Sequence, residues 1–445
     1  MIYPPKGSKK LLNAWAFYDW ANSVYSLVIA SAIFPIFYGA ITIVKDSDGN
    51  IIDDTINFMG FNFNNDSLIS YVTALAFLMV SIFSPFLSGI SDYVGNKKTF
   101  LKFFCYLGAI SCIGLFWFSL DFLWFGLLCY FFALIGFWSS LVFYNSYLPD
   151  IAFPEQQDKI SAKGFSLGYI GSVILLIICL IMIMKYEWFG FEDEGLPTRL
   201  SFVLTGIWWI GFSQYTYKYL PKGNKKEKLT RNVLFNGFKE IKKIWFALKS
   251  QKMLSRYLMA FFTYSMAVQT IMLIATYFGI EELDWGEQDP TTGLIVSILL
   301  IQLVAVVGAT LTSRIALKIG NIKTLIFLNI FWIFICVYAY FIVTPQEFYV
   351  AAASVGLVMG GIQALSRSTY SKMLPENTKD TASYFSFYDV SEKIGIVIGM
   401  SMYGIVAQLT GSVRNAILFL IVFFMGGVIL LLRVPKKTDD PVKVN

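Results

Sequence analysis

The sequence predicts an all-α membrane protein with twelve transmembrane helices arranged as two six-helix pseudo-repeats. Apolar residues make up 56% of its 445 residues and charged residues only 14%, whereas about a quarter of the residues in soluble domains are charged. Twelve apolar stretches each approach or exceed the roughly 20 residues that a helix needs to cross a bilayer. A basic turn at 95–99, GNKKT, recurs 225 positions later at 320–324 as GNIKT. A second echo, 148–150 (LPD) and 374–376 (LPE), keeps nearly the same spacing and indicates a duplicated chain.

Each apolar stretch is expected to form a spanning helix, because a helix satisfies its own backbone hydrogen bonds where water is absent. The first stretch covers about 30 residues, far more than the apolar core of a signal peptide, so we expect it to be retained. The breaks after the third and eleventh stretches are short and predict tight helical hairpins. In order, the stretches are 15–44, 68–90, 100–120, 122–147, 160–184, 200–219, 255–280, 292–317, 324–343, 348–370, 382–409 and 413–432.

The placement of charge predicts how the chain crosses the membrane. Twelve spans put both termini on one side, and thirty of the 35 Lys and Arg residues then fall on that side. Four basic residues, Lys45, Lys185, Arg199 and Arg414, fall on the other side. Because cytoplasmic loops carry the excess of Lys and Arg, both termini are expected in the cytoplasm. We predict a multi-pass protein of a bacterial cytoplasmic (inner) membrane.

A basic linker divides the chain into two six-helix domains, predicted at 1–220 and 253–445. Within the linker, 221–252, apolar residues fall at intervals of three and four, which predicts an amphipathic helix on the inner membrane face. This helix either packs under the bundle or senses lipid, and the pattern does not separate the two. The apolar stripe consists of Leu234, Phe238, Ile241, Trp245 and Leu248.

Several kinds of chemistry have no motif in this chain. Histidine is absent and the five cysteines all lie within apolar stretches, without the paired spacing of a metal site. No phosphate-binding loop, dinucleotide glycine pattern or nucleophile elbow is present. We therefore predict that the protein is not an enzyme and binds no cofactor, metal or nucleic acid. We also expect it to work as a monomer in the lipid bilayer.

The first basic turn is expected to do more than reverse the chain. Gly95 can adopt the positive φ that a reversal needs, and Lys97 and Lys98 can reach phospholipid headgroups. Asp92, at the end of the preceding helix, can hold a cation or cap the N-terminus of a neighbouring helix. In the second turn Leu317 stands at the aspartate position. The second turn therefore lacks a carboxylate that could play either role.

Two sets of six spans with this linker and these turns resemble the major facilitator superfamily. The turn 88–98 (SGISDYVGNKK) is similar to the cytoplasmic signature of that superfamily, with matches at Asp92, Gly95 and Lys97. The resemblance implies that Asp92 helps to latch the two halves together on the cytoplasmic side. The first turn should then dock on the opposite half, while the second turn, with Leu317, serves mainly as a topological anchor.

A narrower resemblance is carried by four motifs in order. Residues 15–25 (WAFYDWANSVY), 144–149 (YNSYLP), 360–368 (GGIQALSRS) and 385–388 (FSFY) are similar to the vacuole-effluxer branch, which includes autophagy-related vacuolar amino-acid exporters. The resemblance implies a secondary active transporter that moves amino acids or similar small solutes by alternating access. A different class, a transporter-like receptor or a lipid- and amphiphile-handling protein, stays open.

Ionisable residues inside the spans are the first candidates for a solute site, because such residues usually face the bundle interior. Asp389 and Lys393 are four residues apart and can form an ion pair within one helix. That pair leaves Asp19 and Glu392 without an obvious partner, and Arg367 could pair with either of them.

Two interpretations of these five charges follow. Asp19, Arg367, Asp389, Glu392 and Lys393 form one gate network that touches no solute, or they bind a zwitterion. In the second case the solute ammonium lies on Asp19 or Glu392 and its carboxylate on Lys393 or Arg367, and Asp19 or Glu392 can exchange a proton in each cycle. The two interpretations are compatible, because a gate that breaks when solute competes for its ions couples binding to opening. The neutral residues expected to contribute to the site are Asn22, Tyr25, Asn145, Gln269 and Gln363.

Overall fold

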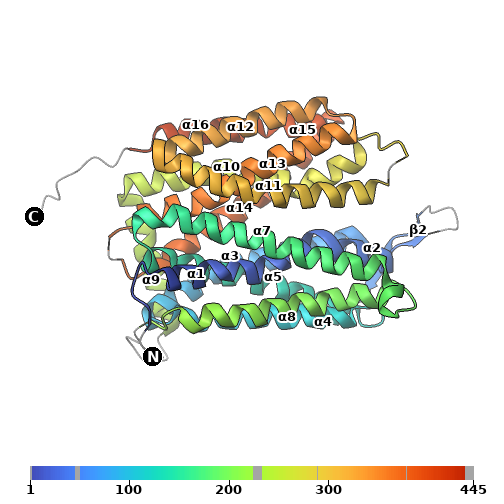
Figure 1. Ribbon diagram of the computed structural model, residues 1–445, viewed down its shortest axis with the longest axis horizontal. Helices are drawn as coiled ribbons and strands as arrows, with labels where there is room; N and C mark the ends of the chain where they lie inside the picture. The colour runs from blue at the N-terminus through green and yellow to red at the C-terminus, as the bar shows by residue number, and fades with distance from the viewer. Residues whose placement is uncertain (1–2, 46–50, 224–232, 288, 377, 436–445) are drawn as a thin grey trace, which may run out of the picture.

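The computed structural model describes residues 3–45, 51–223, 233–287, 289–376 and 378–435, and its helices run side by side along the long axis (Figure 1). The first half, coloured blue to green, lies beside the second, coloured yellow to red. We call the end that carries α9 and the N-terminus the linker end. The opposite end, which carries β2, is called the hairpin end.

The elements follow the predicted order of spans closely. In the first half they are α1 (Lys9–Val24), η1 (Tyr25–Ile33), α2 (Phe34–Thr42), β1 (Val44–Lys45), β2 (Ile51–Asp53), β3 (Thr55–Phe58), β4 (Phe61–Asn64), α3 (Asn65–Val94), α4 (Lys97–Gly114), η2 (Leu115–Trp117), α5 (Leu123–Ser146), α6 (Leu148–Ile151), α7 (Pro154–Met184), η3 (Tyr186–Phe189) and α8 (Gly195–Tyr219). After α9 (Val233–Ser250) come α10 (Lys252–Glu281), α11 (Pro290–Ile319), α12 (Asn321–Phe341), α13 (Pro345–Met373), α14 (Thr381–Thr410), α15 (Val413–Phe419) and α16 (Ile421–Leu432).

Eleven helical segments of the described residues are long and apolar enough to cross a membrane. The predicted sixth span corresponds to α8, which has 25 residues but is not among the eleven. Its ends carry Arg199 and Lys218, and it packs against α1 and α4 along the outside of the first half (Figure 1). The helical membrane fold is therefore confirmed, while the count of twelve spans depends on α8.

Two small antiparallel hairpins between the first and second spans depart from the all-α prediction. Strands β1 and β2 pair with each other, and β3 pairs with β4. Residues 55–58 (TINF) and 61–64 (FNFN) alternate polar and apolar side chains, which suits strands. Between them Met59 and Gly60 both have positive φ, 54° and 85°, as a tight two-residue hairpin turn requires.

The first span is interrupted by η1, a nine-residue π-helix between α1 and α2. Pro35 lies in the first turn of α2 and has no N–H to donate to the preceding turn. The regular hydrogen-bond ladder therefore cannot run unbroken through this point. Wide turns of this kind are frequent at functional sites.

Each half has its own apolar core, and large apolar side chains also cover the outside. The two principal core clusters divide largely between the first and second halves. Exposed residues such as Leu78, Phe103, Ile207 and Phe334 lie on the spanning helices, as expected where lipid replaces water. Between the halves, α7 packs against α11 and α13, and α14 packs against α3 and α5.

The linker helix α9 is only partly as predicted. Ile244 and Leu248 are buried, but Trp245 is 49% exposed even though it belongs to the predicted apolar stripe. The side chains of Leu234, Phe238 and Ile241 lie outside the described residues. Lys243 pairs with Asp380 at 2.8 Å, and α9 packs against α3 and α14. The helix therefore contacts both halves beneath the bundle.

Candidate functional site

A cavity of about 380 Å³ lies between the two halves. Its first-half wall comes from α1, η1, α3, α5 and α7, and its second-half wall from α10, α11, α13 and α14. Polar residues, among them Ser23, Ser26, Thr73, Ser172 and Gln302, alternate with aromatic rings on these walls. A few polar groups in a mostly apolar cleft are typical of small-molecule sites.

Most of the site residues predicted from sequence line this cavity. Asp389 and Lys393 are the exceptions, because they lie next to Glu392 on α14 without forming part of the wall. A solute in the cavity thus meets Glu392 before it meets Lys393. The predicted residues on the wall are Asp19, Asn22, Tyr25, Asn145, Gln269, Gln363, Arg367 and Glu392.

The Arg367 cluster joins the two halves. The Arg367 guanidinium, on α13, donates to Asp19 Oδ2 at 3.2 Å, Asn145 Oδ1 at 3.1 Å and Ser161 Oγ at 2.9 Å. Tyr144 donates its hydroxyl to the same Asp19 oxygen at 2.8 Å. These partners of Arg367 all belong to the first half, so the cluster is a charged bridge across the domain interface.

Aromatic rings hold the Arg367 guanidinium in place. It lies 4.2 Å from the centre of the Phe165 ring and 4.9 Å from that of Trp15, distances at which a cation is attracted to a ring face. The Arg367 side chain is 3% exposed. Gly164 lets α7 approach this closely, because a Cβ there would collide with Asp19 Oδ2 and lie 3.1 Å from Arg367 Nη2.

The Lys393 cluster lies mainly within the second half. Lys393 Nζ is 2.7 Å from Asp389 Oδ1 and 3.0 Å from Glu392 Oε2, and Gln269 donates to the other Glu392 oxygen at 2.7 Å. The predicted ion pair between Asp389 and Lys393 is confirmed. A first-half ring, Trp138, lies under the ammonium with its centre 3.6 Å from Nζ.

Arg367 pairs with Asp19, one of the two partners predicted for it, whereas Glu392 pairs with Lys393, which also holds Asp389. Among the described residues, no hydrogen bond or ion pair joins the Arg367 cluster to the Lys393 cluster. The five charges therefore form two clusters rather than one gate network.

The first turn docks on the opposite half through Asp92. Gly95 ends α3 with φ of 69°, and Asp92 accepts hydrogen bonds from the backbone N–H of Ala382 at 3.3 Å and Ser383 at 2.7 Å. These are first-turn amides of α14, where a carboxylate is favoured. Asp92 was predicted either to hold a cation or to cap a neighbouring helix, and in the structure it caps the N-terminus of α14.

The prediction that Lys97 and Lys98 contact phospholipid headgroups is wrong, because both side chains bind protein acceptors. Lys97 forms an ion pair with Asp150 at 2.6 Å and donates to the Thr381 hydroxyl across the interface. Lys98 is 6% exposed and donates to the Leu220 carbonyl at 2.8 Å. Protein acceptors at the ends of neighbouring helices thus take the place of lipid.

The second turn docks as well, contrary to the prediction that it is only an anchor. Asn321 donates to Asp158 Oδ1 of α7 at 2.9 Å, and Lys372 lies 2.5 Å from Asp158 Oδ2. Leu317, at the aspartate position, is exposed. The carboxylate missing from this turn is supplied instead by the opposite half.

The hydrogen bonds between the two halves given above lie on the linker side of the cavity or at its mid-depth. The one nearest the hairpin end along α7 and α13 joins the Tyr169 hydroxyl to Gln363 Oε1 at 2.8 Å. From there the cavity wall continues toward the hairpin end through Ala30 and Ser31 of η1. The linker end is thus closed by polar contacts.

Several polar atoms on the cavity wall have no hydrogen-bond partner among the described residues. They are Asn22 Nδ2, Tyr25 Oη and Gln302 Oε1. A buried polar atom without a partner is costly, so a polar solute can stabilise this wall. Both donors and acceptors are available to it.

Sequence reasoning missed several residues of the site. Tyr144, Ser161, Gly164, Phe165 and Trp138 hold the two clusters but carry no charge, and their partners are distant in the chain. Trp15 and Tyr144 do lie in two of the motifs noted above, at 15–25 and 144–149. Their presence in these two motifs is the sequence signal that could have placed them at one site.

The comparisons with known proteins cover nearly the whole chain. The family model described as "Vacuole effluxer Atg22 like" matches residues 7–440. This chain belongs to the vacuole effluxer Atg22-like family. A Bacillus subtilis relative, the uncharacterized MFS-type transporter YxiO, is 31% identical over 439 residues, covering 97% of this chain and 96% of that protein. Autophagy-related protein 22 of Kluyveromyces lactis is 23% identical, covering 95% and 92%.

The vacuole effluxer-like chain has the same fold as several solved structures of other proteins. The proton:xylose symporter XylE has a TM-score of 0.68 at 12% identity, covering 96% of this chain and 95% of that one. The E. coli fucose:proton symporter FucP has a TM-score of 0.66 at 14% identity, covering 96% and 98%. The chain therefore has the major facilitator fold, and its relatives are transporters of this superfamily rather than enzymes.

Proposed function

We propose that this transporter carries amino acids or similar zwitterions by alternating access, with the central cavity as the solute site. The observation that carries the proposal is that one carboxylate, Glu392, and one guanidinium, Arg367, line the same cavity of about 380 Å³. A zwitterion presents the two complementary charges in one small molecule. The family description, vacuole effluxer, supports export as the direction of transport.

The solute ammonium is assigned to Glu392 and Gln269. The Glu392 side chain is 17% exposed, more than those of Asp389 and Lys393. Two carboxylates share one ammonium in the Lys393 cluster, so the cluster carries one negative charge in excess when all three groups are ionised. A second ammonium, from the solute, balances that charge inside a low-dielectric site.

The solute carboxylate is assigned to Arg367, where it competes with Asp19. The guanidinium offers a planar set of donors that suits a carboxylate, and Asn22 and Tyr25 have donors free on the facing wall. If the solute takes the place of Asp19, the charged bridge between the halves opens. Binding would then release the linker end, as alternating access requires.

The linker end is assigned to the cytoplasm. It carries most of the basic residues of the chain, which favours a cytoplasmic position. The conformation described here is then closed toward the cytoplasm, with the cavity extending toward the outside. Binding of a solute at Arg367 would initiate the inward opening in uptake, and the same steps in reverse would give export.

Proton exchange is assigned to Glu392 or Asp19. Both carboxylates line the cavity, where Asp19 pairs with Arg367 and Glu392 shares the Lys393 ammonium with Asp389. Gain of a proton by either one therefore changes the net charge of its cluster directly. The neutral variants Glu392→Gln and Asp19→Asn mimic the protonated state. If neither variant changes the dependence of transport on a pH gradient, proton coupling through these groups is ruled out.

Flux into proteoliposomes tests the proposal as a whole. Purified protein is reconstituted, and uptake of labelled amino acids, sugars and organic acids is compared with and without a pH gradient. We expect amino acids to accumulate and Arg314→Gln, an exposed arginine away from the cavity, to behave like the unaltered protein. Binding of an amino acid without accumulation would instead support a receptor.

A further inference from the structure

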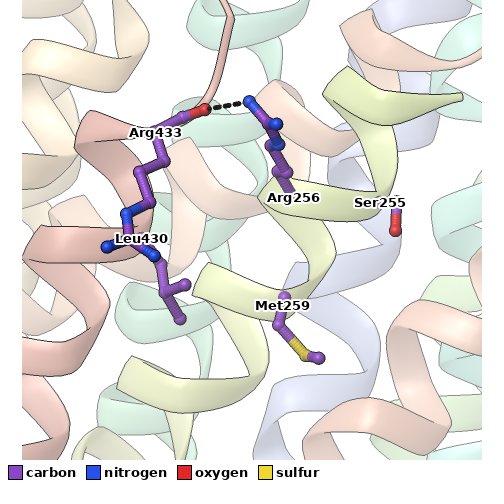
Figure 2. A pocket seen from close by; sticks show the side chains of 5 residues that line it. All are labelled: Ser255, Arg256, Met259, Leu430 and Arg433. Carbon is purple, nitrogen blue, oxygen red and sulfur yellow. Dashed lines mark hydrogen bonds between the residues drawn. The ribbon is translucent and has the colours of Figure 1, made fainter.

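A second pocket, which we call the two-arginine pocket, lies apart from the central cavity on the side of the second half (Figure 2). It has a volume of about 400 Å³ between α10 and the end of α16. Arg256 donates Nη1 to the backbone carbonyl of Arg433 at 2.9 Å, the dashed line in Figure 2. The lining residues are Ser255, Arg256, Met259, Leu430 and Arg433.

The positive charge of this pocket is not balanced within the part of the chain that the structure describes. Arg256 and Arg433 are both exposed, and neither forms an ion pair with a described carboxylate. Arg256 uses one nitrogen on a neutral carbonyl, which leaves its charge and its other donors available. In Figure 2 the side chain of Arg433 runs from its own carbonyl toward Leu430. The site thus suits an anion.

The surroundings of the pocket identify the source of the anion. On α16 the exposed residues Val422, Met425, Ile429 and Leu432 recur at intervals of three and four, which places them on one apolar face. On α10 the exposed Met259 faces the same pocket. The two arginines therefore lie at the end of a lipid-facing surface, at the level of headgroups rather than in a solute pathway.

We propose that the two-arginine pocket binds the phosphate of an anionic phospholipid in the linker-side leaflet. The Arg256 guanidinium offers its remaining donors to the phosphate oxygens, and the exposed Arg433 side chain, whose guanidinium lies beside Leu430 in Figure 2, turns toward the same phosphate. The planar donors of both groups favour this pairing. Met259 and Leu430 contact the first carbons of the acyl chains. A phosphatidylcholine headgroup fits less well because its ammonium is brought close to two cations, whereas basic pockets between spanning helices suit anionic headgroups.

The test uses purified full-length protein in neutral detergent. Thermal unfolding is followed while phosphatidylglycerol, phosphatidylcholine or inorganic phosphate is added at equal phosphate concentration, and native mass spectrometry counts the lipids that stay bound. Arg433→Gln is the principal variant, because it removes a guanidinium and keeps the carbonyl that Arg256 requires. Arg314→Gln, an exposed arginine of α11 outside the pocket, is the matched control.

We expect phosphatidylglycerol to stabilise the unaltered protein and Arg314→Gln equally, and Arg433→Gln to bind it about tenfold more weakly. Arg433→Lys keeps the charge without the planar donors, so its affinity for phosphatidylglycerol should lie between those of the unaltered protein and Arg433→Gln. An intermediate affinity would show that the loss in Arg433→Gln does not come from a folding defect. Equal stabilisation by phosphatidylcholine would overturn the headgroup selectivity. Equal stabilisation by inorganic phosphate would show a soluble-anion site, and equal binding by Arg433→Gln and Arg314→Gln would remove the pocket altogether.

Discussion

Two charged clusters border the same cavity, but they are anchored in different ways. In the Arg367 cluster the charges come from opposite halves, with Arg367 on α13 and Asp19 on α1. In the Lys393 cluster all three charges lie on α14, and Gln269 of α10 supports them from the same half. Any movement that separates the halves must break the first cluster, whereas the second can move as a unit.

This difference suggests a division of labour. A bridge that is remade in every cycle suits a gate, because its bonds form in one state and are lost in the other. A cluster that stays with one half suits solute or proton binding, because its geometry survives the rocking. The following predictions test that division, and the largest expected effects come first.

Arg367→Gln should have the largest effect. It leaves Asp19 buried without a counter-charge, and breaking a buried pair in this way costs on the order of 3–5 kcal/mol. We expect transport to fall below detection and the melting temperature to drop. The double variant Asp19→Asn/Arg367→Gln should regain stability but not flux. Normal transport by Arg367→Gln would show that this cluster is not part of the cycle.

Gly164→Ala should weaken the same gate without changing any charge. The added methyl group collides with Asp19 Oδ2, so the linker end should close less completely, and we expect transport to slow about tenfold, equivalent to about 1.4 kcal/mol. Gly211→Ala is the control, because a Cβ there meets nothing within 4 Å. The measurement is initial uptake rate at saturating solute. Equal rates in the two alanine variants would contradict a close fit of α7 on the gate.

Glu392→Gln and Asp389→Asn should distinguish the carboxylate that contacts the solute from the carboxylate that only holds Lys393 in place. Glu392 lines the cavity and Asp389 does not, so we expect Glu392→Gln to raise the apparent KM about tenfold. Asp389→Asn should leave the KM within about threefold, because its hydrogen bond to Lys393 can persist. Uptake curves for both variants over the same solute range make the comparison. The reverse order of KM values would place the solute on the other side of the cluster.

How much of this site could be foreseen varies with the distance between partners in the chain. The pair Asp389 and Lys393 follows from helical spacing, and the eleven apolar spans follow from composition. The pair Asp19 and Arg367 is separated by 348 positions, and no local pattern can place such residues together. The acceptor of Lys98, the Leu220 carbonyl, is a backbone atom that the sequence does not distinguish from any other, so this contact could not be predicted.

Trp138→Leu should have the smallest effect of the set. Its ring is the first-half surface under the Lys393 ammonium, and a cation–ring contact of this kind contributes about 0.5–2 kcal/mol. We expect a two- to fivefold change in transport rate and little change in KM. Trp138→Phe keeps a ring and should be closer to the unaltered protein. A loss as large as that of Arg367→Gln would mean that the Lys393 cluster also bridges the halves.

The π-helical segment η1 is a point in the first span, at the level of the cavity, where the helix can change its conformation. A π turn holds one residue more than an α turn, so its conversion to regular α-helix rotates the residues beyond it by about 100°. Tyr25 and Ser26 lie in this segment and line the cavity. The span can therefore exchange the side chains it presents to a solute through a change within η1, in which the buried residues of this segment repack against α7 and α8.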